Sequence, residues 1–145
     1  MIINRAMANA RVTLIEGMQF VATADSGHAV VMDATPAVGS RSTAPRPMEL
    51  LIMAFGGCSG MDVISILRKK KQDVSRFEIN VRGEMAETTP HYYTALHIEY
   101  VVTGRGISEE AVKRAIELSL EKYCAVGATL GKAAKITHSY RIIQE

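Results

Sequence analysis

The sequence of 145 residues contains no tryptophan, and aromatic residues of all kinds make up only 6% of it. Such a chain has few of the side chains on which proteins stack single-stranded nucleic acid. The formal net charge is only +2. The one dense basic run, from Arg68 to Lys71, follows an apolar segment, where cations stabilise a helix C-terminus. We therefore expect no nucleic-acid partner.

Long uninterrupted apolar runs are also scarce. The first residues contain no continuous apolar region and no clear cleavage site, so a signal peptide is not indicated and we expect a cytoplasmic location. One segment, Leu50–Leu67, approaches the length of a membrane span, but it contains Asp62 and three glycines. We interpret it as a buried central helix and expect no membrane partner.

Cysteine occurs only twice, as Cys58 and Cys124. In the cytosol, cysteines so far apart in sequence are not expected to form a structural disulfide. They also lack the close paired spacing of a zinc site or of a C-x-x-C redox motif. The four histidines lie in predicted turns and strands without helical ligand spacing: His28, His91, His97 and His138. We therefore expect neither a metal nor a cofactor.

What the sequence does contain, 48% hydrophobic and 22% charged residues, describes one globular domain over residues 1–145. Alternating apolar residues and turn signals predict strands at 10–17, 19–25, 28–34, 76–85, 94–104 and 136–143. Pro47 and Glu49 suit the first turn of a helix, and Ser108 suits the N-cap of a second helix ending near Tyr123. The inward face of that second helix is predicted to be Ala111, Val112, Ala115, Leu118 and Ser119. This order of elements predicts an α+β fold, with antiparallel sheet packed on two long helices.

The glycine pair Gly56–Gly57 predicts a break in the first helix, because each glycine costs about 1 kcal/mol relative to alanine in a helix interior. A further helix is then expected from near Cys58 to about Lys70. Its free N–H groups would point at the Cys58 sulfur and favour the reactive thiolate. Small residues around both cysteines would let two helices cross closely and bring the sulfurs together. The alternative is two inert core cysteines, because free cysteine is among the most buried residue types.

Two blocks of sequence carry a family resemblance: "PMELLIMAFGGCSGMDV" at 47–63 and "LSLEKYCAVGATLGKAAKITHSYRI" at 118–142. With "FEINVRGE" between them, nearly the whole chain resembles the OsmC/Ohr family of osmotically inducible and organic hydroperoxide resistance proteins. The similarity is greatest to the OsmC-like redox branch. The resemblance implies an OsmC-like domain in an intertwined homodimer, with two active sites at the subunit interface.

The resemblance also implies roles for particular residues. In the peroxidase members a first cysteine attacks the peroxide O–O bond and becomes a sulfenic acid, and a second cysteine condenses with it to a disulfide. By position, Cys58 would be the peroxidatic residue and Cys124 the resolving one. A dithiol reductant, a lipoylated protein in some members, would reopen the disulfide. Glu49 falls on the family's active-site carboxylate, which pairs with an arginine.

The sequence departs from the peroxidases at this arginine. The peroxidases take it from the N-terminal strand region, whereas residues 16–31 of this chain contain none. Arg41 and Arg46 lie in the loop before the helix and are candidates to pair with Glu49, and Arg11 is a more distant one. The alternative is that each is an ordinary surface cation.

Three functional hypotheses follow. The first is thiol-dependent reduction of organic hydroperoxides by Cys58 and Cys124, with organic substrates favoured because Met53, Phe55 and Met61 neighbour the first cysteine. The second is a non-catalytic dimer that binds a small apolar or thiol-bearing ligand. The third is a structural dimer with unreactive thiols. Close sulfurs with a guanidinium near Cys58 would favour the first.

Overall fold

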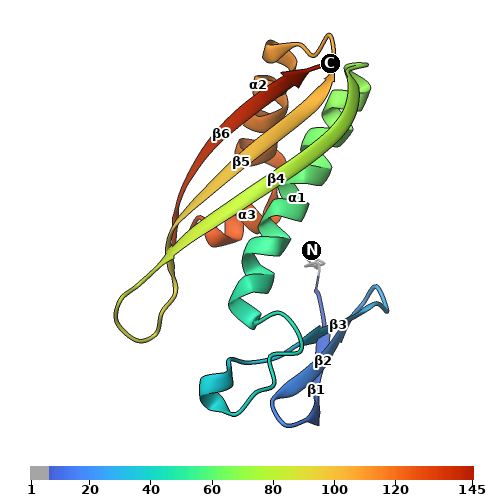
Figure 1. Cartoon of the computed structure of the whole chain (residues 1–145). Helices are drawn as coiled ribbons and strands as arrows, with labels where there is room; N and C mark the ends of the chain where they lie inside the picture. The colour runs from blue at the N-terminus through green and yellow to red at the C-terminus, as the bar shows by residue number, and fades with distance from the viewer. Residues whose placement is uncertain (1–6) are drawn as a thin grey trace, which may run out of the picture. The chain divides into compact units, whose positions relative to one another are not determined.

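The computed structural model describes residues 7–145, and the chain forms two compact units, one ending at Leu51 and the other spanning Ile52–Glu145. The predicted α+β fold is confirmed, since each unit contains a three-stranded sheet and helices are present as well (Figure 1). That residues 1–145 act as one domain stays a prediction.

The first unit contains an antiparallel sheet of three strands joined by tight turns. Its strands are β1 (Ala10–Glu16), β2 (Gln19–Ala24) and β3 (Ala29–Met32), in the order β1-β2-β3. All three lie within the predicted ranges. Many of their apolar side chains are largely exposed in the single chain, and these include Val12, Leu14, Ile15, Val30 and Val31.

The loop after β3 is organised by the carboxylate of Asp33, which is only 5% exposed. This carboxylate accepts hydrogen bonds from the hydroxyls of Ser40 and Thr43 and from the backbone N–H groups of Ala34 and Thr43. These bonds, with that from Ser40 having the largest effect, hold the pKa of Asp33 well below its usual range. The loop includes a short 3-10 helix, η1 (Pro36–Val38), and ends at the helix α1.

Helix α1 runs without interruption over 23 residues, Pro47–Lys69. The predicted break at Gly56–Gly57 is therefore wrong. The physical reason is packing: a Cβ at Gly56 would lie 3.2 Å from the side chain of Val81, so glycine lets the helix approach the next strand closely. Tertiary packing of this kind outweighs the weak helix propensity of the glycines.

The buried face of α1 repeats every fourth residue, at Phe55, Ser59, Val63 and Leu67. The hydroxyl of Ser59 therefore lies in the middle of an otherwise apolar row.

By length and composition α1 could cross a membrane, with a mean hydropathy of 1.9 over an 18-residue window, of which 33% is buried. Core helices of soluble proteins meet the same criterion.

The second unit is built on the sheet β4 (Asp73–Met85), β5 (Tyr93–Arg105) and β6 (Lys135–Gln144), with the helices on one face (Figure 1). β4 and β5 are antiparallel, but β5 and β6 are parallel, with Ala95 opposite Lys135. The prediction of a purely antiparallel sheet is wrong for this last strand. The helical connection between β5 and β6 is what allows parallel pairing, because a tight hairpin cannot join parallel strands.

The core of the second unit lies between this sheet and the helices. Alternate residues of β5 are fully buried: Leu96, Ile98, Tyr100 and Val102. The predicted half-buried row of β4, Phe77, Ile79 and Val81, is confirmed. The ring of Phe77 stacks on that of Tyr100 with centroids 6.5 Å apart.

Helix α2 (Glu109–Leu118) begins as predicted, with the Ser108 hydroxyl accepting a hydrogen bond from the Ala111 N–H at 3.2 Å. Its buried residues are Ala111, Val112, Ala115 and Ile116, whereas Leu118, predicted to face inward, is only half-buried. The predicted α-helix to Tyr123 instead changes at Ser119 into a π-helical turn, η2 (Ser119–Tyr123). Cys124 then adopts an extended conformation before the short helix α3 (Ala125–Leu130).

Candidate functional site

The two cysteines meet inside the second unit although they are far apart in sequence. Cys58 lies in the middle of α1 and is half-buried, whereas Cys124, between η2 and α3, is only 3% exposed. Both are free thiols. Cys58 is one of the groups that raise the pKa of Cys124, so the two side chains lie close enough to interact. The structure therefore brings together the two residues that the sequence singled out as a reactive pair.

Cys124, and not Cys58, stands at a helix N-terminus. Because α1 continues through the glycine pair, Cys58 lies in a helix interior, and its predicted activation by a helix N-terminus is wrong. The Cys124 sulfur accepts a hydrogen bond from the Gly127 N–H at 3.2 Å and so caps α3. Gly127 has to be small here, since a Cβ would lie 2.9 Å from the Phe55 ring and 3.2 Å from this sulfur.

The environment of Cys124 keeps its thiol protonated. Burial raises the pKa of Cys124 from 9.0 to about 11, and the interaction with Cys58 and the negative charge of Asp62 act in the same direction. The hydrogen bond from Gly127 opposes these effects only in part. At neutral pH Cys124 is therefore a buried neutral thiol beside the more exposed Cys58.

A buried chain of hydroxyl groups runs beside the two cysteines. The Ser59 Oγ lies 2.6 Å from the Tyr100 Oη and 2.7 Å from the Ser119 Oγ. The Ser119 hydroxyl also donates to the Asp62 carboxylate at 2.9 Å. Ser59, Ser119 and Tyr100 are each 0% exposed. Burial raises the pKa of Tyr100 to about 12, so its phenol stays protonated and can donate.

Sequence reasoning did not assign these polar residues to the site. The sequence contains a signal for three of the four residues. Ser59 interrupts the apolar row of α1, and Ser119 is predicted only as an inward-facing helix position. Asp62 follows Cys58 by one helical turn, which places both side chains on the same side of α1.

The first unit holds the predicted charged pair. The Arg46 guanidinium donates to the Glu49 Oε1 at 2.7 Å, and the Arg46 backbone N–H donates to the Glu49 Oε2 at 2.9 Å. The second bond is that of a helix-capping glutamate reaching back to the residue before the first turn. Of the three arginines considered from the sequence, Arg46 is thus the one that pairs with Glu49.

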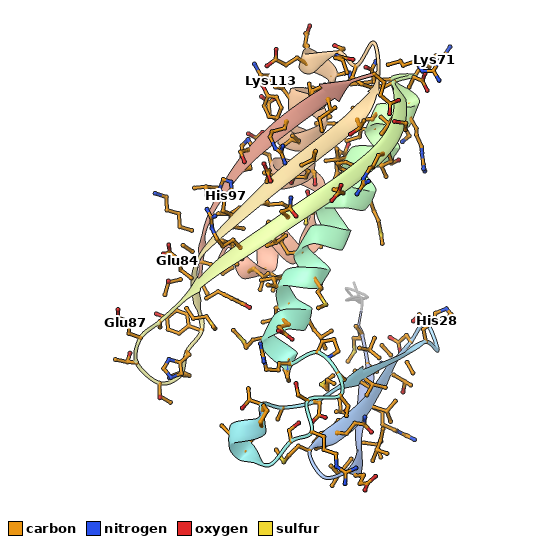
Figure 2. All side chains as sticks on the ribbon, in the orientation of Figure 1. His28, Lys71, Glu84, Glu87, His97 and Lys113 are labelled. Carbon is orange, nitrogen blue, oxygen red and sulfur yellow. The ribbon has the colours of Figure 1, made fainter. Side chains whose placement is uncertain are left out.

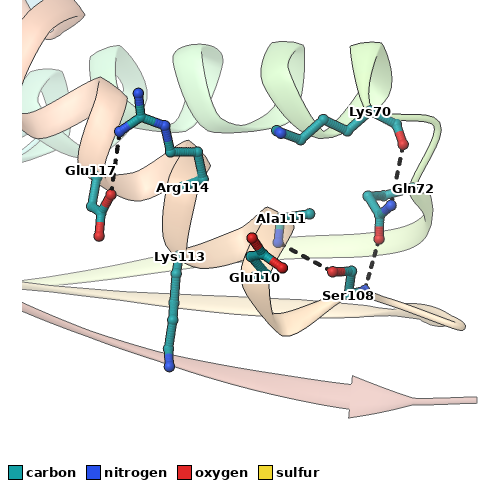
Figure 3. Close-up of a pocket in the computed structure, with 8 residues that line it drawn as sticks. All are labelled: Lys70, Gln72, Ser108, Glu110, Ala111, Lys113, Arg114 and Glu117. Carbon is teal, nitrogen blue, oxygen red and sulfur yellow. Dashed lines mark hydrogen bonds and ion pairs between the residues drawn. The ribbon is translucent and has the colours of Figure 1, made fainter.

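Two pockets of the second unit differ in character. A groove of about 430 Å³ beside α1 and β4 is lined by Ile52, Met53, Gly56, Gly57, Phe77, Ile79 and Val81. Of the apolar residues predicted to surround the cysteine, only Met53 lines it, since Phe55 is fully buried and Met61 is 73% exposed. A polar pocket of about 600 Å³ at the start of α2 contains neither cysteine (Figure 3).

The hydrogen bonds of His28 and His97 do not involve the thiol pair. His28 is in the β2–β3 turn, and His97 on β5 is held between the hydroxyls of Thr137 and Ser139 at 2.8 and 2.9 Å (Figure 2). Within residues 7–145, no three or more His, Cys, Asp or Glu side chains are grouped so that they could hold a metal ion.

Comparisons with known proteins show the family and the fold of this chain. The sequence profile described as OsmC-like protein matches residues 39–139. Protein YhfA of Escherichia coli strain K12 is 45% identical over 134 residues, which cover 92% of this chain and 97% of YhfA. A hypothetical protein from Aquifex aeolicus VF5 is 29% identical, with a TM-score of 0.84 over 97% of this chain and 99% of that one. The organic hydroperoxide resistance protein OhrB of Bacillus subtilis shares the fold, with a TM-score of 0.61 at 15% identity over 94% of this chain and 98% of OhrB. The chain therefore belongs to the family of OsmC-like proteins.

Proposed function

We propose that this protein reduces organic hydroperoxides through Cys58 and Cys124. The observation that carries the proposal is the pair of free, interacting thiols inside the second unit. Membership of the OsmC-like family supports it, as does the fold shared with organic hydroperoxide resistance proteins.

The proposed reaction has three balanced steps. The Cys58 thiolate attacks the terminal oxygen of the hydroperoxide, the O–O bond breaks, and the alcohol leaves after taking up a proton. Cys58 is then a sulfenic acid. The Cys124 thiol condenses with it: an S–S bond forms, the S–O bond breaks, and the thiol proton leaves with the hydroxyl as water. A dithiol reductant finally exchanges with the disulfide, returning both thiols and becoming oxidised itself.

The geometry suits a division of roles between the two thiols. Cys58 is the more exposed, as a residue that meets an external peroxide should be. Cys124 is buried and protonated, and so is protected from direct oxidation until the sulfenic acid forms. For Glu49 and Arg46 the proposed role rests on their position in the family motif and on their ion pair. Arg46 would supply the cation that orients the peroxide.

Turnover of cumene hydroperoxide with dihydrolipoamide as reductant tests the proposal. We expect Cys58→Ser to lower the rate at least about a hundredfold, because it removes the nucleophile. Without the reductant, Cys124→Ser should consume about one equivalent of peroxide and keep Cys58 as sulfenic acid, whereas wild type should end as the disulfide. Lys69→Ala, an exposed change at the far end of the same helix, is the control and should keep full activity. Equal background turnover in wild type and both cysteine variants would contradict the proposed peroxidase activity.

The apolar groove supports a second candidate function, namely binding of a small apolar ligand without turnover. Its lining is almost entirely aliphatic, aromatic or glycine. Saturable binding of an apolar fluorescent probe, abolished by Met53→Glu, together with no peroxide turnover in any variant, would favour this candidate over the peroxidase.

A further inference from the structure

We propose that the buried chain Tyr100–Ser59–Ser119–Asp62 is a clamp that holds the two cysteines opposite each other. In this proposal Ser59 and Ser119 are positioning residues for the Cys58–Cys124 disulfide. The inference deepens the proposed function and rests on it, since it concerns the pairing of these two thiols.

The clamp is attached to the backbone beside both cysteines. Ser59 directly follows Cys58 on α1. Ser119 is connected to the other cysteine through its carbonyl oxygen, which accepts the Cys124 N–H at 2.7 Å. The two serine hydroxyls are 2.7 Å apart, and the Ser119 hydroxyl also donates to Asp62 of α1 at 2.9 Å, so Ser119 is joined to the helix that carries Cys58.

The hydrogens of this chain can be assigned in one direction. An ionised carboxylate only accepts, so the Ser119 hydroxyl donates to Asp62. Ser119 has then used its hydrogen and accepts from Ser59, and Ser59 in turn accepts from the Tyr100 phenol. Each hydroxyl donates once, so all three are satisfied in this arrangement. Because the three hydroxyl residues are fully buried, solvent cannot readily replace a lost partner.

The clamp also fixes the local backbone before Cys124. The bond from the Cys124 N–H to the Ser119 carbonyl spans five residues and closes the π-helical turn. Such turns are uncommon and often lie at functional sites. Because Ser119 begins this turn and is held by Ser59 and Asp62, its position determines where the Cys124 sulfur points.

Clamp and disulfide must stabilise each other if the clamp positions the thiols. By thermodynamic linkage, if the hydrogen bonds of the clamp favour the disulfide over the two free thiols, then formation of the disulfide strengthens the clamp to the same extent. Cutting the clamp should therefore lower the effective concentration of one thiol near the other. The disulfide should then become easier to reduce.

The test is the equilibrium of the protein with oxidised and reduced dithiothreitol. Here the dithiol protein and cyclic dithiothreitol exchange to give the protein disulfide and reduced dithiothreitol. We expect Ser119→Ala to lower this equilibrium constant about tenfold, which corresponds to a reduction potential about 30 mV less negative. Ser59→Ala removes one of the links between Ser119 and α1 but leaves the hydrogen bond from Ser119 to Asp62, so it should shift the constant in the same direction by a smaller factor, about threefold. It replaces Ser119→Ala if that variant does not fold. Tyr100→Phe removes only the outermost donor and should change the constant less than about twofold.

Val112→Ala provides the control for general destabilisation. Val112 is fully buried in α2 but does not belong to the clamp. This variant should melt at a lower temperature while keeping the wild-type equilibrium constant. A wild-type constant in both serine variants, or an equal shift in Val112→Ala, would overturn the clamp while leaving the peroxidase intact. Peptide mapping that finds no Cys58–Cys124 disulfide in oxidised wild type would overturn both.

Discussion

At the scale of single residues, the two thiols differ in ways that matter for their chemistry. Cys124 is buried and its pKa is raised, whereas Cys58 is the more exposed. Asp62 adds a negative charge that further favours the neutral Cys124 thiol. The asymmetry arises from the surroundings, because both residues are chemically identical cysteines.

This asymmetry predicts slow alkylation of Cys124 in the folded protein. In Cys58→Ser, where burial still raises the pKa, iodoacetamide at pH 7 should react about a hundredfold more slowly with folded than with urea-unfolded protein. The rate should increase as the pH rises toward 11, because the reactive form is the thiolate. Mass spectrometry of quenched samples measures it, with Cys124→Ser as the matched variant that reports on Cys58. Equal rates in folded and unfolded Cys58→Ser would contradict a buried, protonated thiol.

Sequence patterns identified some residues and missed others for a physical reason. The Ser108 cap and the Glu49 turn depend on local spacing, which the sequence contains in full. Ser59 and Ser119 are hydrogen-bond partners that lie 60 residues apart in the sequence, which is farther than a local sequence pattern extends. A buried hydroxyl is therefore recognised only when its partner is known.

At the scale of elements, helix α1 shows why glycine is an ambiguous signal. Intrinsic propensity predicts a break at the glycine pair, and the sequence alone offers nothing to oppose it. In the structure, Gly56 and Gly60 face the side chains of Val81 and Ile79. These contacts join residues that are far apart in the sequence, and they stabilise the helix against the low helix propensity of glycine. Gly57 differs, because a Cβ there would meet no atom within 4 Å.

Alanine substitutions on α1 can separate the effect of helix propensity from the effect of packing against β4. Gly57→Ala should raise the free energy of unfolding by about 1 kcal/mol, because it improves helix propensity without a clash. Gly60→Ala gains the same propensity, but its Cβ would lie 2.5 Å from the Ile79 Cδ1, so that side chain must move and the gain should be smaller. Urea denaturation at one protein concentration gives both values. Destabilisation by Gly57→Ala would instead indicate that the helix is interrupted there.

The path of the chain from β5 to β6 also cannot be predicted from local sequence patterns. Strand β6 was predicted with nearly its observed bounds, but its direction in the sheet depends on how α2 and α3 return the chain. The π-helical turn inserts one extra residue where the sequence continues to look helical. Existence of an element is local information, whereas pairing and register are not.

At the scale of the whole molecule, the exposed apolar side chains of the first sheet fit the homodimer that the family resemblance implies. Val12, Leu14 and Val30 lie on one face of the first sheet, as the strand register places them, and are each about half exposed. Contiguous exposed apolar surface commonly marks an interface. A second copy of this chain is the partner that the family resemblance implies.

The dimer leads to the final prediction. At micromolar concentration wild type should sediment with about twice the chain mass of 15.8 kDa. Leu14→Glu places a charge in the apolar face and should weaken association at least about tenfold, because burying an unpaired carboxylate is costly. Thr13→Glu puts the same charge on the opposite face of β1 and should leave the mass unchanged, since successive strand residues alternate. Sedimentation equilibrium distinguishes the outcomes, and a monomeric wild type would contradict the homodimer.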